Sequence, residues 1–157
     1  MTPAQMRFRP MSEADLATVV ELERCSQYTP WTEGNFRDAL AAGNLCLIAA
    51  LERRIAGVAV LQMAAGEAEL LTMAIQPELR RQGMGRRMLA EIVTRAADYG
   101  ADAMWLDVRV SNDAAIALYR KAGFIETGRR KDYYRTATGR EDALMMRLAM
   151  PLQRKDR

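Results

Sequence analysis

The pattern of apolar and polar positions begins with two apolar runs that predict a β-hairpin. Residues 45–51 and residues 55–63 are both almost wholly apolar, and a short charged turn separates them. This arrangement is typical of two antiparallel strands. A third strand is predicted at residues 67–75, where side chains alternate with period two and Glu67 and Glu69 share one face.

Helical periodicity precedes these strands. After a short predicted strand at residues 5–9, Ser12 and Asp15 form a capping-box-like start for a helix. The apolar stripe of this helix ends near Cys25. An aromatic loop follows, and Thr32 can cap a second helix. We therefore expect two helices before the first hairpin.

The middle of the chain predicts a β-turn-α-β unit. The strand at residues 67–75 leads through a glycine turn into a helical pattern at residues 84–99, which Gly100 ends. Residues 103–110 then return as a strand. A strand-helix-strand passage implies that the two strands are parallel.

The C-terminal third predicts a further helix and two strands. Ser111 or Asn112 caps the helix, and Phe124 begins a strand. We expect residues 132–140, which include two tyrosines, to form a polar loop, and residues 141–148 to form the last strand.

The order of elements predicts an α/β fold with a mixed, mostly antiparallel central sheet flanked by helices. One parallel βαβ unit lies in its middle. A chain of 157 residues fits one domain, which we assign to residues 1–150. Residues 151–157 are expected to form a charged C-terminal tail.

Composition removes several kinds of chemistry. The sequence has no histidine, which excludes Ser-His-Asp triads, Cys-His pairs and histidine-bearing metal sites, so no metal is expected. Two cysteines are too few for a disulfide framework and favour a reducing compartment. The longest apolar run is too short to span a bilayer, and residues 1–10 lack the apolar core of a signal peptide. We expect a cytoplasmic protein with no membrane partner.

The net charge of +3 favours anionic partners, and a glycine-rich turn at residues 80–86 provides a place for one. Gly83 and Gly85 leave backbone N–H groups uncovered at the start of a helix, where the helix dipole attracts a phosphate. An ordinary helix start with a solvated basic rim is the alternative. No known nucleic-acid module is visible, so direct nucleic-acid binding is not expected.

Three segments together resemble the GNAT superfamily of acetyltransferases. They are Arg80-x-x-Gly83-x-Gly85, Trp105-Leu106-Asp107-Val108-Arg109-x-Ser111-Asn112, and Ala114-Ala115-Ile116-x-Leu118-Tyr119-x-x-x-Gly123-Phe124. Three further segments resemble the bacterial ribosomal-protein-alanine N-acetyltransferases within that superfamily: Pro30-Trp31-Thr32-Glu33, Tyr133-Tyr134 and Gly139-Arg140-Glu141-Asp142-Ala143. The resemblance covers nearly the whole chain and implies the GNAT fold.

The resemblance implies that acetyl-coenzyme A is the acetyl donor. Its pyrophosphate would lie on the backbone amides of Arg81, Gln82, Gly83, Met84, Gly85 and Arg86. The backbone of Met73, Ala74 and Ile75 would pair with the pantetheine arm, and an N–H near Met73 would hold the oxyanion. Asn112 would touch the donor as well as cap its helix.

The resemblance also implies the catalytic groups. Asp107 stands where the family usually has a glutamate base, and its shorter side chain favours proton transfer through one water. Glu69 is the alternative base, and Glu67 is expected to be a solvated charge at a strand end. Tyr119 occupies the general-acid position.

Each of these roles has a simpler alternative. Asp107 could form an ion pair with Arg109 or another nearby cation, and Tyr119 could be a core aromatic. Trp31, Tyr133 and Tyr134 resemble walls of a substrate groove, but aromatics in polar loops also form small cores of their own.

The expected reaction is direct attack of an amine on the thioester. An α-amine with a pKa of about 8 is roughly a tenth neutral at pH 7, whereas a lysine needs about 3 kcal/mol of additional help. An N-terminal acceptor therefore needs only a modest base, and the resemblance implies that this acceptor is the N-terminus of a ribosomal protein that begins with alanine. The alternatives are acetylation of lysine side chains or a small amine, and a non-catalytic acyl-coenzyme A sensor.

Overall fold

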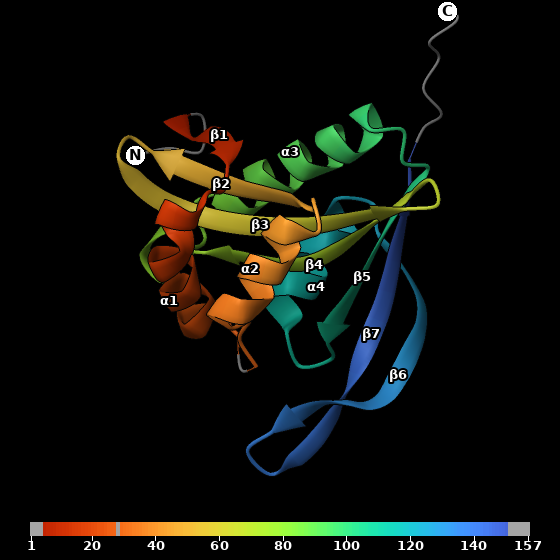
Figure 1. Ribbon diagram of the computed structural model, residues 1–157. Coiled ribbons are helices and arrows are strands. Elements are labelled where there is room, and N and C mark those ends of the chain that lie inside the picture. The colour runs from red at the N-terminus through yellow and green to blue at the C-terminus, as the bar shows by residue number, and fades with distance from the viewer. Residues whose placement is uncertain (1–4, 28, 151–157) are drawn as a thin grey trace, which may run out of the picture. The chain divides into compact units, whose positions relative to one another are not determined.

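The computed structural model describes residues 5–27 and 29–150, so the predicted tail at residues 151–157 lies outside the described residues. Figure 1 shows the elements along the chain. In order they are β1 (Arg7–Pro10), a 3-10 turn η2 (Glu13–Asp15), α1 (Leu16–Ser26), α2 (Glu33–Ala41), β2 (Leu45–Leu51), β3 (Arg54–Ala64), β4 (Glu67–Ile75), a second 3-10 turn η3 (Pro77–Leu79), α3 (Met84–Asp98), β5 (Ala103–Arg109), α4 (Asp113–Lys121), β6 (Ile125–Thr136) and β7 (Gly139–Ala149).

The seven strands form one mixed sheet in the order β1-β2-β3-β4-β5-β7-β6. The pair β4–β5 is parallel, with Ala68 opposite Met104 and Glu69 opposite Trp105. The pairs β1–β2, β2–β3, β5–β7 and β6–β7 are antiparallel. This topology confirms the predicted fold class and the predicted parallel βαβ unit.

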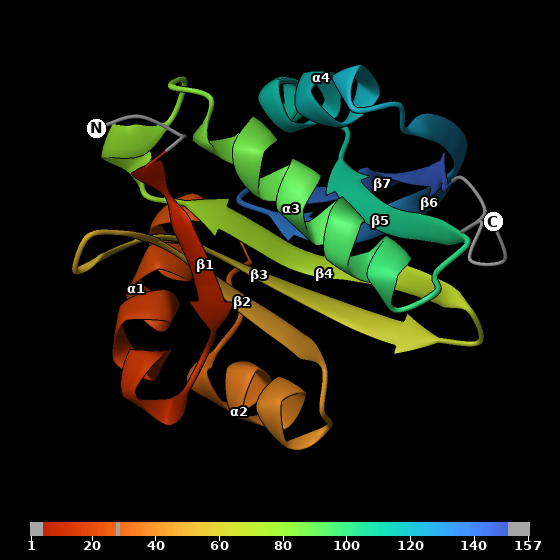
Figure 2. The same ribbon diagram turned by 90° about the horizontal axis from the view of Figure 1, so that it is seen from above.

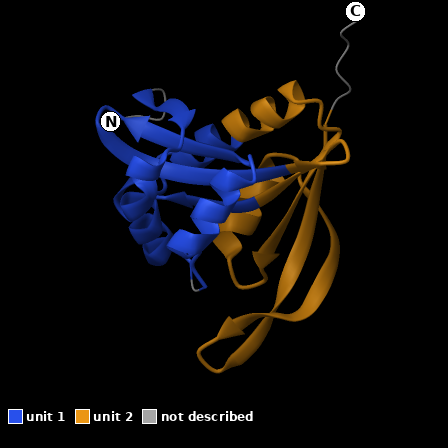
Figure 3. Ribbon diagram, in the orientation of Figure 1, with its two compact units in different colours: residues 1–62, 71–89 blue, residues 63–70, 90–157 orange. Residues whose placement is uncertain are grey.

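Two compact units divide the described chain, and Figure 3 colours them separately. The first contains the chain up to Gln62 together with Leu71–Leu89, and the second contains Met63–Leu70 and the chain from Ala90 onward. The division falls inside β4 and inside α3. That residues 1–150 form a single domain stays a prediction.

The first unit is built on β2 and β3, which are buried along most of their length because helices cover both faces. Figure 2 shows α1 and α2 on one side of these strands and the start of α3, whose residues 84–89 belong to this unit, on the other. Phe36 of α2 is fully buried in the core between the helices and the sheet. On the other face, a Cβ added at Gly57 would lie 2.7 Å from Ile75 Cδ1 and 2.9 Å from the Ala74 carbonyl oxygen. Gly57 therefore permits a close approach of β3 to the end of β4.

Local capping follows the sequence. Thr32 Oγ1 accepts a hydrogen bond of 3.2 Å from the Asn35 N–H, and Asn112 Oδ1 accepts one of 3.2 Å from the Ala115 N–H. A capping box also forms at residues 12–15. The predicted caps at Thr32 and Asn112 are confirmed, because a cap depends only on residues one turn apart. The box at residues 12–15 opens the 3-10 turn η2, and α1 follows it from Leu16.

The second unit corrects one prediction. Residues 132–140 are mostly strand rather than loop, since β6 continues to Thr136 and β7 begins at Gly139. The result is the long hairpin in blue in Figure 1. Most of β6 is exposed, so no alternation of apolar and polar residues marks it as a strand. What makes it a strand is its antiparallel pairing with β7, in which Tyr134 lies opposite Glu141.

Candidate active site

The glycine turn has the backbone geometry of an anion site. Arg81 and Gly83 both have positive φ, at 61° and 81°, immediately before α3 begins. The first N–H groups of a helix have no partner within the helix, and here they belong to residues 84–86. Residues 81–83 are exposed, and so is Arg86. Among the described residues, neither Arg81 nor Arg86 pairs with an acidic side chain, so both charges stay available to an anion.

The other two arginines of this segment are engaged inside the first unit. Arg80 Nη2 donates to Ser26 Oγ at 2.9 Å, and Arg80 Nε donates to the Ile75 carbonyl at 3.3 Å. The Arg87 guanidinium lies 4.8 Å from the centre of the Phe8 ring. Arg80 and Arg87 therefore hold the turn to its surroundings.

The C-terminal half of β4 precedes this turn. Ala74 and Ile75 are buried and Met73 is half-buried. Gln27, at the end of α1, donates its Nε2–H to the Met73 carbonyl at 3.3 Å. The proposed contacts of these three β4 residues with a pantetheine arm stay predictions.

Glu23 is a buried acid that the sequence interpretation missed. Its residue is 1% exposed. The Thr72 hydroxyl donates to Glu23 Oε1 at 2.9 Å and to Oε2 at 3.0 Å, and the Trp31 N–H donates to Oε2 at 3.2 Å. Burial raises the pKa of the Glu23 carboxyl, and these hydrogen bonds oppose that rise. A signal was present, because Glu23 lies four residues after Val19 on the apolar stripe of α1.

The environment of Trp31 is compatible with both of its predicted roles, part of a small core and a wall of a substrate groove. Its ring meets Phe36 edge-on at 5.1 Å between centroids and packs against the core of the first unit. The residue is nevertheless only half-buried, so part of it remains accessible. Contact between Trp31 and a substrate stays a prediction.

Asp107 lies on β5 in the second unit with 17% of its side chain exposed. Arg130 Nε of β6 lies 3.3 Å from Asp107 Oδ2 and 3.4 Å from Oδ1. Arg109, the partner considered from the sequence, instead pairs with Glu141 at 3.2 Å. The Arg130 side chain is 48% exposed, so this ion pair contributes at most about 1 kcal/mol to stability.

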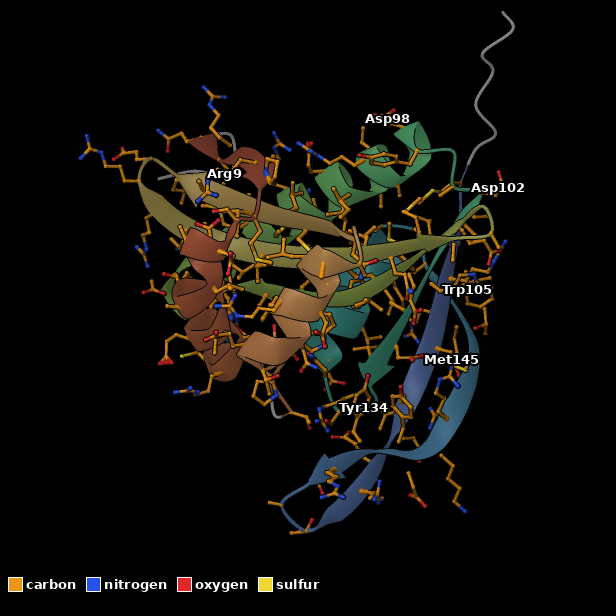
Figure 4. The ribbon with its side chains drawn as sticks, viewed as in Figure 1. Arg9, Asp98, Asp102, Trp105, Tyr134 and Met145 are labelled. Carbon is orange, nitrogen blue, oxygen red and sulfur yellow. The ribbon has the colours of Figure 1, made fainter. Side chains whose placement is uncertain are left out.

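The two tyrosines of β6 join the same cluster. The Arg109 guanidinium lies 4.4 Å from the centre of the Tyr134 ring, and the Arg130 guanidinium lies 5.6 Å from that of Tyr133. The two rings meet edge-on at 5.0 Å. Burial raises the pKa of Tyr134, and the negative charge of Asp107 raises it further. Figure 4 labels Tyr134 beside the lower part of β7.

Tyr119 of α4 is buried, with 8% of the residue exposed. Its ring meets Phe124 edge-on at 5.6 Å, as the core interpretation requires. Burial raises the pKa of Tyr119 to about 12. The ionised form of Tyr119 also raises the pKa of Tyr134, so the two phenols interact electrostatically in one neighbourhood with Asp107. The structure thus brings together Asp107, Tyr119, Tyr133 and Tyr134.

The two glutamates of β4 in the second unit differ from each other. Glu69 is exposed, opposite Trp105 across the parallel pair. Glu67, expected to be a solvated charge at a strand end, is the half-buried first residue of β4, and its Oε1 accepts a hydrogen bond of 2.9 Å from Trp105 Nε1. The Arg147 guanidinium lies 5.4 Å from the centre of the Trp105 ring. Glu69 stays the alternative base.

Within residues 5–27 and 29–150, no group of three histidine, cysteine, aspartate or glutamate side chains could hold a metal ion. No helix in this part of the chain is long and apolar enough to cross a membrane.

Comparison with known proteins gives consistent results. Residues 16–124 match the family model described as the acetyltransferase (GNAT) family. The [ribosomal protein bS18]-alanine N-acetyltransferase of Salmonella typhimurium is 36% identical over 142 residues, which are 90% of this chain and 96% of that protein. The putative [ribosomal protein bS18]-alanine N-acetyltransferase of Bacillus subtilis is 34% identical over 88% of this chain and 91% of its own.

Solved structures give a similar result. The ribosomal-protein-S18-alanine N-acetyltransferase from Escherichia coli superposes with a TM-score of 0.88 at 32% identity, covering 97% of this chain and 98% of its own. Ard1 from Thermoplasma volcanium has a TM-score of 0.85 at 22% identity, covering 94% of this chain and 99% of its own, and so shares the fold.

Proposed function

Because this chain belongs to the GNAT family of acetyltransferases, we propose that it acetylates the N-terminal α-amine of a ribosomal protein that begins with alanine. The observation that carries the proposal is the 36% identity over 90% of the chain to a relative with that activity in its name. The acetyl donor is acetyl-coenzyme A. We propose that the reaction takes place in the cytoplasm, where ribosomal proteins are synthesised. We expect neither nucleic acid nor membrane as a direct partner.

The turn before α3 fits the phosphates of the donor. Positive φ at Arg81 and Gly83 leaves backbone N–H groups free at the helix start, and the charges of Arg81 and Arg86 add to their field. The backbone at Met73 would pair with the pantetheine arm and supply an N–H to the oxyanion.

Asp107 would accept the proton of the attacking amine through a water molecule. Arg130 pairs with the Asp107 carboxylate, whose side chain stays partly exposed and so accessible to a water molecule. The demand on this base is modest, because an α-amine with a pKa of about 8 is roughly a tenth neutral at pH 7. Tyr133 and Tyr134, held by arginine side chains, would form one wall for the acceptor chain.

Tyr119 would interact with the thiolate of coenzyme A as it leaves. With a pKa of about 12, this phenol carries its proton at any working pH. A thiol has a reference pKa of about 8.5, so complete proton transfer from Tyr119 would be uphill by roughly 5 kcal/mol in the free protein. The phenol therefore stabilises the leaving thiolate mainly as a hydrogen-bond donor, and water can supply the proton afterwards.

Three acceptors test the proposal. The purified chain is incubated with acetyl-coenzyme A and either an alanine-initiated peptide with internal lysines, the same peptide with a blocked N-terminus, or spermidine. We expect acetylation of the free N-terminus alone, located by fragmentation mass spectrometry. Transfer to lysine in the blocked peptide, or to spermidine alone, would replace this proposal with the corresponding activity. Donor binding without any transfer would indicate a sensor.

A further inference from the structure

Glu23 is an unusual residue to find in the core of the first unit. It is 1% exposed, and none of the arginine or lysine side chains in the described residues pairs with its carboxylate. A buried carboxylate without a counter-charge costs free energy unless hydrogen bonds compensate it. An apolar side chain at this position of α1 would avoid that cost, so the carboxylate is expected to have another role.

The hydrogen bonds of Glu23 join two segments that the proposed function uses. One donor is the Trp31 N–H at 3.2 Å, at the end of the loop between α1 and α2. The other is the Thr72 hydroxyl at 2.9 and 3.0 Å, one residue before Met73 on β4. A single carboxylate therefore connects a predicted wall of the acceptor groove to the strand predicted to hold the acetyl group.

A second connection runs parallel to the first. Gln27 ends α1, where its N–H donates to the Glu23 carbonyl at 3.0 Å, and its side-chain amide donates to the Met73 carbonyl at 3.3 Å. Glu23 and Gln27 thus bind two successive residues of β4 from the two ends of one helical turn. Because both connections end on β4, the start of the loop and its end at Trp31 are held against the same strand.

We infer that Glu23 is a positioning residue for the acceptor: its buried carboxylate holds the Trp31 end of the loop against β4 at Thr72. The inference rests on the proposed function. Glu23 does not itself touch either substrate, because it is fully buried. Glu23→Gln replaces one of the two acceptor oxygens by an NH2 group, so the Trp31 N–H and the Thr72 hydroxyl would share a single acceptor. The loop would then sample positions in which Trp31 no longer lines the acceptor site.

The test compares Glu23→Gln with Glu21→Gln. Glu21 lies on the same helix, is exposed, and forms only a surface pair with Arg24 at 3.2 Å, so it is a matched control. Steady-state kinetics would use the alanine-initiated peptide, and acetyl-coenzyme A affinity would be measured separately by calorimetry. For Glu23→Gln we expect the KM for the peptide to rise about tenfold, with kcat changing by less than about threefold. The dissociation constant of acetyl-coenzyme A should stay within about twofold, and Glu21→Gln should match the wild type.

A spectroscopic measurement follows the loop directly. In a Trp105→Phe background, Trp31 is the remaining tryptophan, and its emission should shift to longer wavelength in Glu23→Gln as the ring becomes more exposed. If Glu23→Gln does not fold, Thr72→Val serves instead, since it removes the hydroxyl donor and keeps the shape of the side chain. The same change in peptide KM, of smaller size, is expected.

The outcomes separate the two hypotheses. If the wild type transfers no acetyl group to the N-terminal peptide, the proposed function fails and this inference fails with it. If the wild type is active but Glu23→Gln has an unchanged peptide KM and an unchanged Trp31 emission, Glu23 is a structural residue only. Equal losses of acetyl-coenzyme A and peptide affinity would also overturn a role specific to the acceptor.

Discussion

Replacement of Asp107 by asparagine distinguishes a catalytic base from half of an ion pair. The substitution removes the charge and keeps the shape. If Asp107 only pairs with Arg130, the partly exposed pair at 3.3 Å predicts a loss of at most about 1 kcal/mol in stability and no change in turnover. If Asp107 accepts the amine proton, turnover at pH 7 should fall by about a hundredfold, the lower range for general-base catalysis.

The pH dependence of the turnover loss in Asp107→Asn provides a second test of the role of Asp107 as a base. An amine with a pKa of about 8 is roughly 9% neutral at pH 7 and roughly 91% neutral at pH 9. At high pH most of the amine is therefore already deprotonated in solution, and the reaction depends less on the base. The rate of Asp107→Asn should rise about tenfold between these pH values, and the ratio of wild-type to variant rates should narrow.

Assays that measure the release of the coenzyme A thiol across this pH range give the rates of the wild type and of Asp107→Asn. The dissociation constant of acetyl-coenzyme A is the control for donor binding. That constant should be unchanged, because Asp107 is not part of the glycine turn. The matched variant Arg130→Gln removes the pair and keeps the carboxylate, so it should retain most of the turnover. A full rate in Asp107→Asn, or an equal loss in both variants, would refute the assignment and favour Glu69 as the base.

Four further predictions concern the donor site and the core. Tyr119→Phe keeps the buried ring, so the free energy of unfolding should change by less than about 1 kcal/mol while thiol release slows about tenfold or more; an unchanged rate would remove the role of the hydroxyl. Gly57→Ala places a Cβ 2.9 Å from the Ala74 carbonyl, which should lower the free energy of unfolding by about 1–3 kcal/mol in denaturant titrations and weaken acetyl-coenzyme A binding through the displaced strand. Gly83→Ala, at a φ of 81°, should cost about 1–2 kcal/mol and weaken donor binding in calorimetry, whereas an unchanged affinity would place the phosphates elsewhere. The pKa of Glu23 is raised above its ordinary value of 4.5, so the carboxyl ionises in the unfolded chain at a lower pH than in the folded one. The free energy of unfolding of the wild type should therefore fall relative to that of Glu23→Gln as pH rises from about 4.5 through the raised pKa, and a relative rise over this range would contradict the prediction.

Features that depend on neighbours along the chain could be predicted from the sequence. The apolar runs of β2 and β3, the caps at Thr32 and Asn112, and the glycine turn before α3 all appear where expected. The reason is that periodicity, capping and positive φ are set within a few residues. The two C-terminal strands were predicted, but their extension through residues 132–140 was missed, because the exposed residues of β6 carry no periodic signal.

The sequence by itself determined the family, the fold class and the candidate residues, since each rests on local motifs. The tertiary structure decided the partners of those residues: Asp107 with Arg130, Glu67 with Trp105, and Glu23 with Trp31 and Thr72. These partners lie 8 to 49 positions apart along the chain. Which charge meets which donor therefore depends on strand register and helix packing, and no spacing along the chain encodes it.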